Sequence, residues 1–334
     1  MGTLIIAEAG VNHNGSLKSA LALCDAAKTA GADIVKFQTF KTEKVLTRSA
    51  GMADYQASNL GTTESQFDMV KRLELGFGDF TAIKRYCEEI GIEFLSTPDD
   101  EESLNFLTEE LGMRMIKVGS GEVTNIPYLR AIGKKNLPVI LSTGMATLGE
   151  VERALFELHQ AGCPDVTLLH CTTNYPCPMD EVNLRAMVTL CAAFGPRVGY
   201  SDHTKGIVVP VAAVALGAIV IEKHLTLDNS LPGPDHAASL APVDFYPMVT
   251  EIRDTESALG DAVKRPNPSE LRMMQSVRRS IVAAVPISRG AVFCPENLAV
   301  KRAGGIGYPA ELWDFVVGET APRDFAADEV VALQ

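Results

Sequence analysis

The chain alternates short apolar, β-branched runs with amphipathic helical segments from its first residues to about residue 260. The runs are, in order, LIIAEA, DIVKFQT, EFLSTP, RMIKVGS, PVILST, VTLLHCT, RVGYSDH and IVIEKHLT. Between them lie helical patterns such as SLKSALALCDAAKTAG and TLGEVERALFELHQAG, each ending at the glycine that is typical of a helix C-terminus. Eight strands that alternate with helices over about 250 residues predict an α/β fold, a (β/α)8 TIM barrel, rather than an open doubly wound sheet.

Two regions depart from this alternation. The connection from Lys41 to Phe77 is long and polar, and a connection of that length predicts a lid or a wall of a substrate site. After residue 260 the stretch GDAVKRPNPSE predicts a linker, and the pieces RSIVAAV, LAVKRA and FVVGET beyond it predict short strands between Gly and Pro turns. We therefore expect a barrel domain over residues 1–260, a linker over 261–276 and a small β-rich domain over 277–334.

The composition is that of a reduced globular protein with an acidic balance. The formal net charge of −12 argues against a nucleic acid or an anionic membrane as partner, so an anionic substrate would need local cations. The seven cysteines form no C-x-x-C pair and are odd in number, which favours core thiols over disulfides or a zinc site.

Neither a leader nor a membrane span is expected. The first residues lack a basic segment, and Glu8 interrupts the early apolar run. The longest apolar stretch, from Gly206 to Ile221, is shorter than the roughly 20 residues of a membrane helix and contains Pro210 and Gly217. We expect it to divide into a buried helix and a buried strand, and we expect the protein to be cytoplasmic.

Polar and titratable side chains occur at the carboxyl end of every predicted strand, which is where barrels of this type carry their chemistry. One such residue alone is more often a solvated strand end, but the joint pattern indicates a single site. The residues are Glu8, Lys36, Gln38, Ser96, Thr97, Lys117, Ser120, Glu122, Ser142, Thr143, Thr172, Thr173, Ser201, Asp202, His203, Glu222 and His224.

The lysines and histidines of this set suggest specific ligands. Lys36 and Lys117 have apolar neighbours, so their ammonium groups are costly to bury without an anion, and KVGSGE adds glycines and a serine that suit a phosphate. His203 and His224 end successive strands and can face one point, which fits a divalent metal with open positions for water and substrate. The alternative is one catalytic base and one hydrogen-bonded core histidine.

The motifs IAEAGVNHNG, VKFQTF, FLSTP, KVGSGE, LSTGM, HCTTNYPCP, GYSDHT, EKHLTLD and PGPDH together resemble the bacterial sialic acid synthase family, which includes N-acetylneuraminate and N,N'-diacetyllegionaminate synthases. Members of this family condense phosphoenolpyruvate with an N-acyl amino sugar to make a nonulosonic acid. The resemblance spans the whole chain and implies a (β/α)8 barrel followed by an antifreeze-like SAF domain.

The resemblance also assigns roles to individual residues. Phosphoenolpyruvate would be bound by Lys36, Thr97, Lys117, Ser120, Ser142, Thr173 and Ser201. The sugar would be held by Glu8, Gln38, Tyr175 and Asp235. His203 and His224 would bind manganese, or magnesium or cobalt in its place. Family enzymes are dimers in which the small domain inserts an arginine into the partner's site. The segment VKRAGG makes Arg302 the candidate here, with Ala303 where relatives have proline.

The expected reaction needs a neutralised anion, a polarised aldehyde and water delivered to the oxocarbenium centre. Lys36, Lys117 and His203 with its metal meet the first two needs, and we predict Glu122 as the group that transfers the proton. The alternatives are another phosphoenolpyruvate-condensing barrel, which makes a phosphorylated octulosonate or heptulosonate, and a non-catalytic sugar-binding protein. The motifs leave open whether the sugar is N-acetylmannosamine or 2,4-diacetamido-2,4,6-trideoxymannose.

Overall fold

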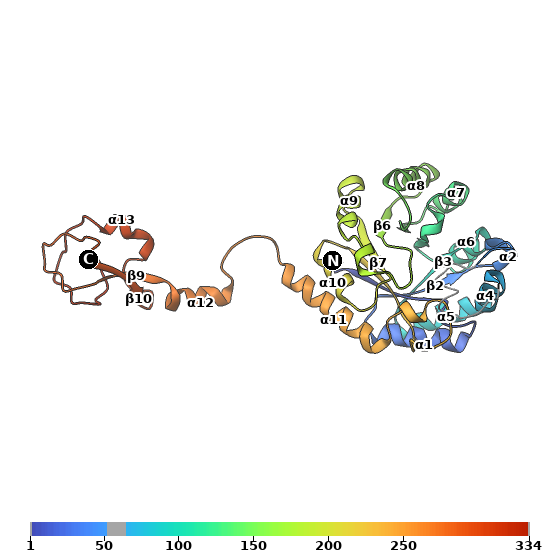
Figure 1. Cartoon of the computed structure of the whole chain (residues 1–334), viewed down its shortest axis with the longest axis horizontal. Helices are drawn as coiled ribbons and strands as arrows, with labels where there is room; N and C mark the ends of the chain where they lie inside the picture. Colours follow the sequence, from blue (N-terminus) through green and yellow to red (C-terminus); the bar gives the residue numbers. More distant parts are fainter. Residues whose placement is uncertain (1, 52–64, 333–334) are drawn as a thin grey trace. The chain divides into compact units, whose positions relative to one another are not determined.

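The computed structural model describes residues 2–51 and 65–332. The chain forms two compact units, Met1–Gly260 and Asp261–Gln334 (Figure 1). The first unit consists of alternating strands and helices, and the second consists of a short helix, two paired strands and irregular segments.

The described part of the first unit contains an eight-stranded sheet in the order β3-β2-β1-β8-β7-β6-β5-β4, and each neighbouring pair is parallel. Strands β3 and β4, at the ends of this order, contact each other and bring the sheet almost to closure, which confirms the predicted barrel. The strands are β1 (Leu4–Gly10), β2 (Ile34–Thr39), β3 (Glu93–Pro98), β4 (Ile116–Val118), β5 (Val139–Ser142), β6 (Val166–His170), β7 (Val198–Asp202) and β8 (Val220–His224).

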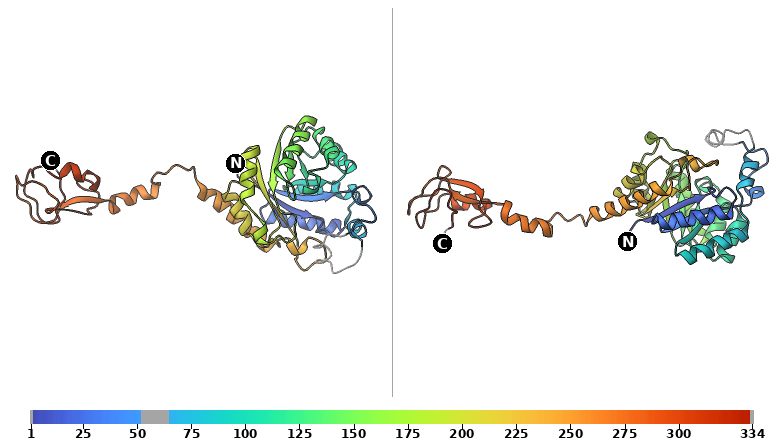
Figure 2. Two further views of the ribbon diagram at one scale, coloured as in Figure 1. Left: turned by 45° about the horizontal axis from the view of Figure 1, so that its top comes forward. Right: turned by 90° about the horizontal axis from the view of Figure 1, so that it is seen from below.

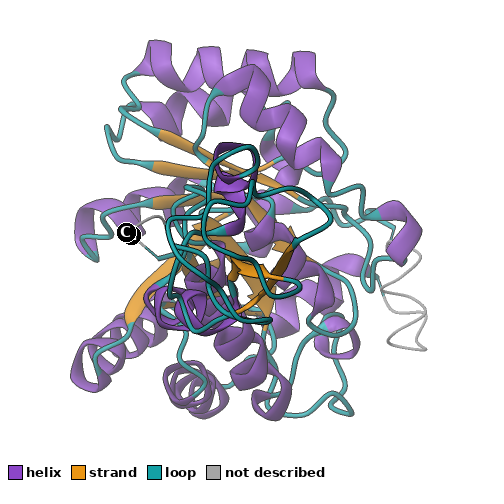
Figure 3. Ribbon diagram, turned by 90° about the vertical axis from the view of Figure 1, so that its left-hand side faces the viewer, coloured by secondary structure: helices purple, strands orange, loops and turns teal. Residues whose placement is uncertain are grey.

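These strands read as continuous apolar runs because helices cover their outer side (Figure 3). The main helices of the unit are α1 (Leu17–Thr29), α5 (Phe77–Ile90), α7 (Ile126–Gly133), α8 (Leu148–Ala161), α9 (Arg185–Phe194), α10 (Val208–Ala215) and α11 (Pro242–Leu259). Helix α1 packs against both α5 and α11 (Figure 2). Ser16 caps α1 and Thr147 caps α8, each by accepting a hydrogen bond from a backbone N–H of the first turn.

The strand register places the polar ends at one level. Glu8 of β1 lies beside Lys36 of β2 on one flank and beside His224 of β8 on the other. Ser201 of β7 lies beside Glu222 of β8 in the same way. Because side chains alternate between the two sides of a strand, this register decides which polar groups share one face.

The connection from Lys41 to Phe77 contains secondary structure that its polar sequence did not predict. Helix α2 (Thr42–Val45) and helix α4 (Gln66–Leu73) lie within it, while residues 52–64 are outside the described residues. Glu74 accepts hydrogen bonds from the backbone N–H and the hydroxyl of Thr42, which fastens the two ends of the connection together. Short helices also follow β3 and the later strands: α6 (Glu101–Asn105), η1 (Phe106–Glu110), η2 (Ser120–Glu122), η3 (Met179–Glu181) and η4 (His236–Ala238).

The long apolar stretch divides as predicted, into α10 and β8. No helix among the described residues is long and apolar enough to cross a membrane. The cysteines are all free thiols, as predicted, and five of them are buried, whereas Cys191 is exposed and Cys294 is partly exposed.

The second unit contains α12 (Pro268–Val277), which lies in the predicted linker of residues 261–276 except for its last residue. It also contains the antiparallel pair β9 (Arg279–Ala283) and β10 (Leu298–Arg302). The third predicted strand, FVVGET, is wrong in its first half. Instead of a strand, a helical turn, α13 (Trp313–Val316), follows η5 (Ala310–Leu312). This turn buries Val316 in the small core of the second unit. Within the run FVVGET, the residue that makes a strand-like bridge is Thr320, which pairs with Val292.

Candidate functional site

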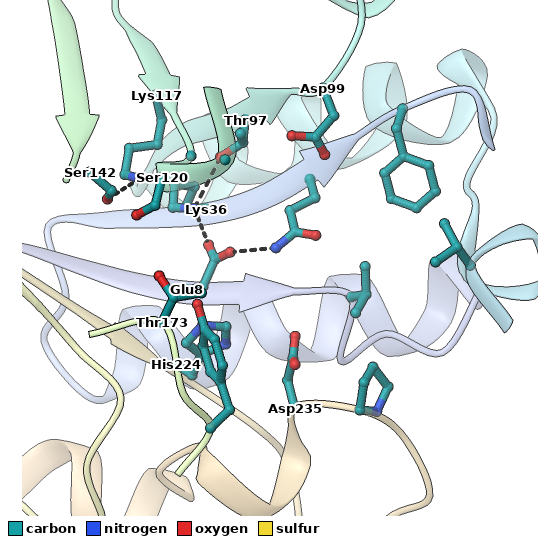
Figure 4. Close-up of a pocket in the computed structure, with 18 of the residues that line it drawn as sticks. Glu8, Lys36, Thr97, Asp99, Lys117, Ser120, Ser142, Thr173, His224 and Asp235 are labelled. Carbon is teal, nitrogen blue, oxygen red and sulfur yellow. Dashed lines mark hydrogen bonds and ion pairs between the residues drawn. The ribbon is translucent and has the colours of Figure 1, made fainter. Parts of the chain in front are cut away.

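A cavity of about 340 Å³ opens at the carboxyl ends of the barrel strands. Most of the predicted site residues line it: Glu8, Lys36, Gln38, Thr97, Lys117, Ser120, Ser142, Thr173, Tyr175, Ser201, His203, His224 and Asp235 (Figure 4). The strand-end residues Ser96, Thr143, Thr172 and Asp202 are not part of its lining. Two residues to which the sequence assigned a role in the reaction also lie outside it. Glu122 is partly exposed, and its carboxylate accepts a hydrogen bond from Asn125 at 2.6 Å. Arg302 is an exposed residue at the end of β10 in the second unit.

The predicted anion-binding lysines are linked by carboxylates of the chain itself. The Lys36 ammonium lies 2.7 Å from Glu8 and 3.6 Å from one oxygen of Glu222, while the Lys117 ammonium lies 3.6 Å from the other Glu222 oxygen. Ser201 donates a hydrogen bond of 2.9 Å to Glu222. The carboxylates of this network offset part of the cost of burying the two lysines without a ligand.

The network separates the pKa values of its two carboxyl groups. Burial raises the pKa of Glu8 to about 7 against the opposing charge of Lys36. Burial would also raise the pKa of Glu222, but the charges of Lys117 and Lys36 lower it to about 2. Burial lowers the pKa of Lys117. Burial disfavours the charged form of Lys36 as well, but Glu222 and Glu8 outweigh this effect and raise its pKa.

Hydroxyl groups surround the two lysines and leave binding capacity free. Lys117 donates to Ser142 at 2.8 Å, and Lys36 donates to Thr97 at 3.2 Å. The buried hydroxyl oxygen of Thr173 has no hydrogen-bond partner within the described residues. A buried polar atom of this kind is costly unless a ligand satisfies it, so the surroundings of Lys117 suit an anion such as phosphate or carboxylate.

His203 and His224 come together as the sequence predicted. Their ring centroids are 5.6 Å apart, and Tyr175 packs on His203 with a centroid distance of 4.1 Å. Nδ1 of His203 lies 2.7 Å from the Thr172 carbonyl oxygen, which fixes the ring. Burial lowers the pKa of His203 to about 4 and that of His224 well below its usual value, so both rings are neutral.

A neutral imidazole pair suits a divalent metal ion, and Nδ1 of His224 is buried without a partner among the described residues. In residues 2–51 and 65–332, no group of three or more His, Cys, Asp or Glu side chains could hold a metal. The observations that fit a metal at this site are therefore the two neutral rings and the unpartnered Nδ1 of His224.

Part of the cavity wall is apolar. Its wall includes the cluster of Val11, Phe40, Met69 and Leu73, so α4 in the long connection forms a wall of the cavity, as predicted. Asp99 and Asp235 also reach this cavity (Figure 4). Burial raises the pKa of Asp235 to about 6.

Sequence reasoning assigned no role to three residues that shape the cavity. Glu222 was noted at a strand end but given no role, although it joins both lysines. Asp99 was not singled out. Gly144 follows β5, and a Cβ there would lie 2.2 Å from the Thr173 hydroxyl, so only glycine lets the backbone pass beside the hydroxyl groups. Glu222 lies on β8, which pairs with both β7 and β1. The strand register is therefore the signal that could have assigned Glu222 a role.

Comparisons with known proteins agree with this geometry. Residues 23–264 match the NeuB family, and residues 278–333 match the SAF domain. The chain is 47% identical to the N,N'-diacetyllegionaminic acid synthase of Campylobacter jejuni over 98% of each chain. It is 46% identical to the Legionella pneumophila enzyme of that name over 95% of this chain and 90% of that protein. The crystal structure of an N-acetylneuraminic acid synthetase from Leptospira borgpetersenii is similar, with a TM-score of 0.71 and 35% identity, and the match covers 83% of this chain and 93% of that one. The chain therefore belongs to the NeuB family and carries a SAF domain after its barrel.

Proposed function

We propose that the protein is a nonulosonic acid synthase that condenses phosphoenolpyruvate with an N-acyl amino sugar and water, releasing phosphate. The observation that carries the proposal is the cavity in which Lys36 and Lys117 lie beside the His203–His224 pair, together with close relatives that are named as such synthases. This arrangement provides an anion site and a Lewis-acid site within one cavity, which the carbon–carbon bond formation requires.

Different residues of the cavity bind phosphoenolpyruvate and the sugar. Lys117, Ser142 and Thr173 bind the phosphate of phosphoenolpyruvate, with Thr97, Ser120 and Ser201 completing the surroundings of its charged groups. Lys36 lies between this region and Glu8, so it can stabilise the negative charge of phosphoenolpyruvate and hold Glu8 in place. Gln38 donates a hydrogen bond of 3.2 Å to Glu8, and we assign Glu8, Gln38, Tyr175 and Asp235 to the sugar.

His203 and His224 would hold a divalent metal ion, for which manganese is our first candidate and magnesium or cobalt the alternatives. When bound, this ion supplies a Lewis acid that polarises the aldehyde of the open-chain sugar. Glu122 remains our candidate for moving the proton of the attacking water. Its carboxylate accepts a hydrogen bond from Asn125 in this structure, so it must turn toward the cavity for that role.

The apolar part of the cavity wall supports a particular sugar. Compared with N-acetylmannosamine, 2,4-diacetamido-2,4,6-trideoxymannose presents a second acetamido methyl group and a methyl group in place of a hydroxymethyl group. Phe40, Met69 and Leu73 can bury such groups favourably. Relatives that are 47% and 46% identical are named N,N'-diacetyllegionaminic acid synthases. We therefore propose N,N'-diacetyllegionaminate as the product, and a cytoplasmic location, where phosphoenolpyruvate is made.

A direct assay tests the function and the sugar together. The full chain is incubated with phosphoenolpyruvate, Mn²⁺ and one sugar at a time, the nonulosonic acid is identified by mass spectrometry, and kcat/KM is compared. We expect the trideoxy sugar to be preferred over N-acetylmannosamine by about 10-fold or more. Chelation should abolish turnover and Mn²⁺ should restore it. A preference for arabinose 5-phosphate or erythrose 4-phosphate would instead assign the chain to the octulosonate or heptulosonate reaction.

We further propose a homodimer in which Arg302 of one chain completes the site of the other. If so, a His203→Ala chain can donate a working arginine and an Arg302→Ala chain can donate a working barrel. Random mixing makes about half of the dimers mixed, each with one intact site, so activity should recover to about a quarter of the wild-type level. Subunit exchange is checked by native mass spectrometry. Recovery at background level after confirmed exchange would mean that Arg302 does not act across the dimer.

A further inference from the structure

Two consecutive aspartates follow β3, and the structure gives them different surroundings. The Asp100 carboxylate accepts hydrogen bonds from the backbone N–H groups of Lys41 and Ser103 and from the Ser103 hydroxyl. It therefore caps α6 and anchors the neighbouring loop. The Asp99 carboxyl lines the cavity, and only its backbone N–H is bound, to the Thr39 carbonyl oxygen. Within the described residues no hydrogen bond or ion pair satisfies the Asp99 carboxyl.

Asp99 lines the cavity apart from the two residues to which we assign the phosphate, Lys117 and Ser142. In the sheet order, β3 lies on one side of β1 and β8 on the other, so Asp99 and Asp235 approach the cavity from opposite flanks of the strand that carries Glu8. Figure 4 shows both carboxyl groups turned toward the cavity, and it shows Asp99 well separated from Lys117 and Ser142. Asp99 therefore lies away from the phosphate region and near the part that we assign to the sugar.

The raised pKa of Asp99 and its lack of a protein donor among the described residues indicate a carboxyl group that can bind a ligand. Burial, followed by the charge of Glu122, raises its pKa to about 7, and Lys36 opposes the shift only in part. Asp99 is partly exposed in the cavity, and its carboxyl has no protein donor in the described part of the chain, so it can accept a hydrogen bond from an O–H or N–H of a ligand that displaces water there. A phosphate group at the same place would be repelled, since it would lie beside the carboxylate form of Asp99 in one cavity.

We infer that Asp99 is a specificity-determining residue that accepts a hydrogen bond from a hydroxyl or amide N–H of the amino sugar and disfavours a phosphorylated sugar. The inference deepens the proposed function and rests on it. It also explains why the two neighbouring aspartates are not equivalent. Asp100 serves the fold, whereas Asp99 selects a neutral sugar that carries hydrogen-bond donors.

The test compares wild type with Asp99→Leu and Asp99→Asn, with Glu101→Gln as matched control because Glu101 is an exposed carboxylate two residues further along. The substrates are 2,4-diacetamido-2,4,6-trideoxymannose, N-acetylmannosamine and N-acetylmannosamine 6-phosphate. Asp99→Leu should lower kcat/KM for the neutral sugars by about 10- to 100-fold, while the KM for phosphoenolpyruvate stays within about twofold. Asp99→Asn, which keeps one acceptor oxygen, should lose less. The preference for neutral over phosphorylated sugar should shrink in both variants.

A structural role would lower kcat/KM for all three sugars by one common factor, and that result would overturn the inference while the proposed function stands. A change confined to kcat, or a matching change in the KM for phosphoenolpyruvate, would also overturn it, because Asp99 would then act on Glu122 or on the phosphate region. Wild-type protein that is inactive with every sugar would refute the proposed function itself, and the inference with it. Circular dichroism confirms that each variant is folded.

Discussion

Neighbouring residues of β7 and β8 differ sharply in their surroundings. Ser201 and Glu222 face the cavity, where Glu222 is shared between Lys36 and Lys117. One residue further along each strand, Asp202 and Lys223 form an ion pair in which both side chains are fully buried, and neither lines the cavity. The comparison teaches that a buried charge at a barrel strand end is functional only on one side of the strand. On the other side it belongs to the fold.

The largest expected effect is on stability, from Lys223→Met. The substitution removes the ammonium partner of Asp202, whose carboxylate is left with the hydroxyl and backbone N–H of Thr204. An uncompensated buried charge typically costs about 3–5 kcal/mol, so the free energy of unfolding of the barrel should fall by about that amount. Urea titration followed by far-ultraviolet circular dichroism measures it.

The position of the only tryptophan provides an internal control for this measurement. Trp313 lies in the second unit, so its fluorescence reports that unit rather than the barrel. Lys223→Met should move the circular dichroism transition and leave the fluorescence transition in place. If both move together, the two units unfold as one and the assignment of the effect to the barrel fails. Adding Asp202→Asn should recover part of the loss, because the unpaired charge is then removed.

Replacing the cavity-side lysine, Lys117, by methionine should lower activity strongly and change stability little. Lys117→Met leaves Glu222 with Lys36 and with the Ser201 hydroxyl, so we expect a change in stability within about 1 kcal/mol. Activity should fall by about 100- to 1,000-fold, since a positive charge aimed at the phosphate is lost. Isothermal titration calorimetry with phosphoenolpyruvate separates binding from chemistry. Wild-type affinity in this variant would contradict the assignment of Lys117 to the anion.

The smallest expected effect is the contribution of Asp99 to the pH dependence of the free energy of unfolding. Its pKa is raised from 3.8 to about 7, so between these values the folded protein keeps a proton that the unfolded chain releases. The free energy of unfolding therefore falls as the pH rises through this window. Asp99→Asn cannot ionise, so relative to wild type it should gain about 1–3 kcal/mol between about pH 4 and about pH 8. Urea midpoints of the two proteins across this range measure the gain, and parallel curves would show that Asp99 is not desolvated.

The sequence predicted the barrel well because strands covered on both sides are continuous apolar runs, and it located most of the cavity because such barrels place polar residues at strand ends. It failed where local signals are ambiguous. The run FVVGET contains Val316, which a helical turn buries as readily as a strand would. Asp99 and Asp100 both resemble helix-capping residues, and Glu222 gains its meaning only from strands that are far away in sequence.

The balanced charges of Glu8, Lys36, Lys117 and Glu222 have a consequence for turnover. A site with unpaired lysines would attract any small anion and would retain the phosphate that the reaction releases. Here each anion must compete with carboxylates that are already in place, so simple phosphate gains little by staying. We therefore expect these ion pairs to favour the departure of the phosphate product and to weaken inhibition by phosphate from the surrounding medium.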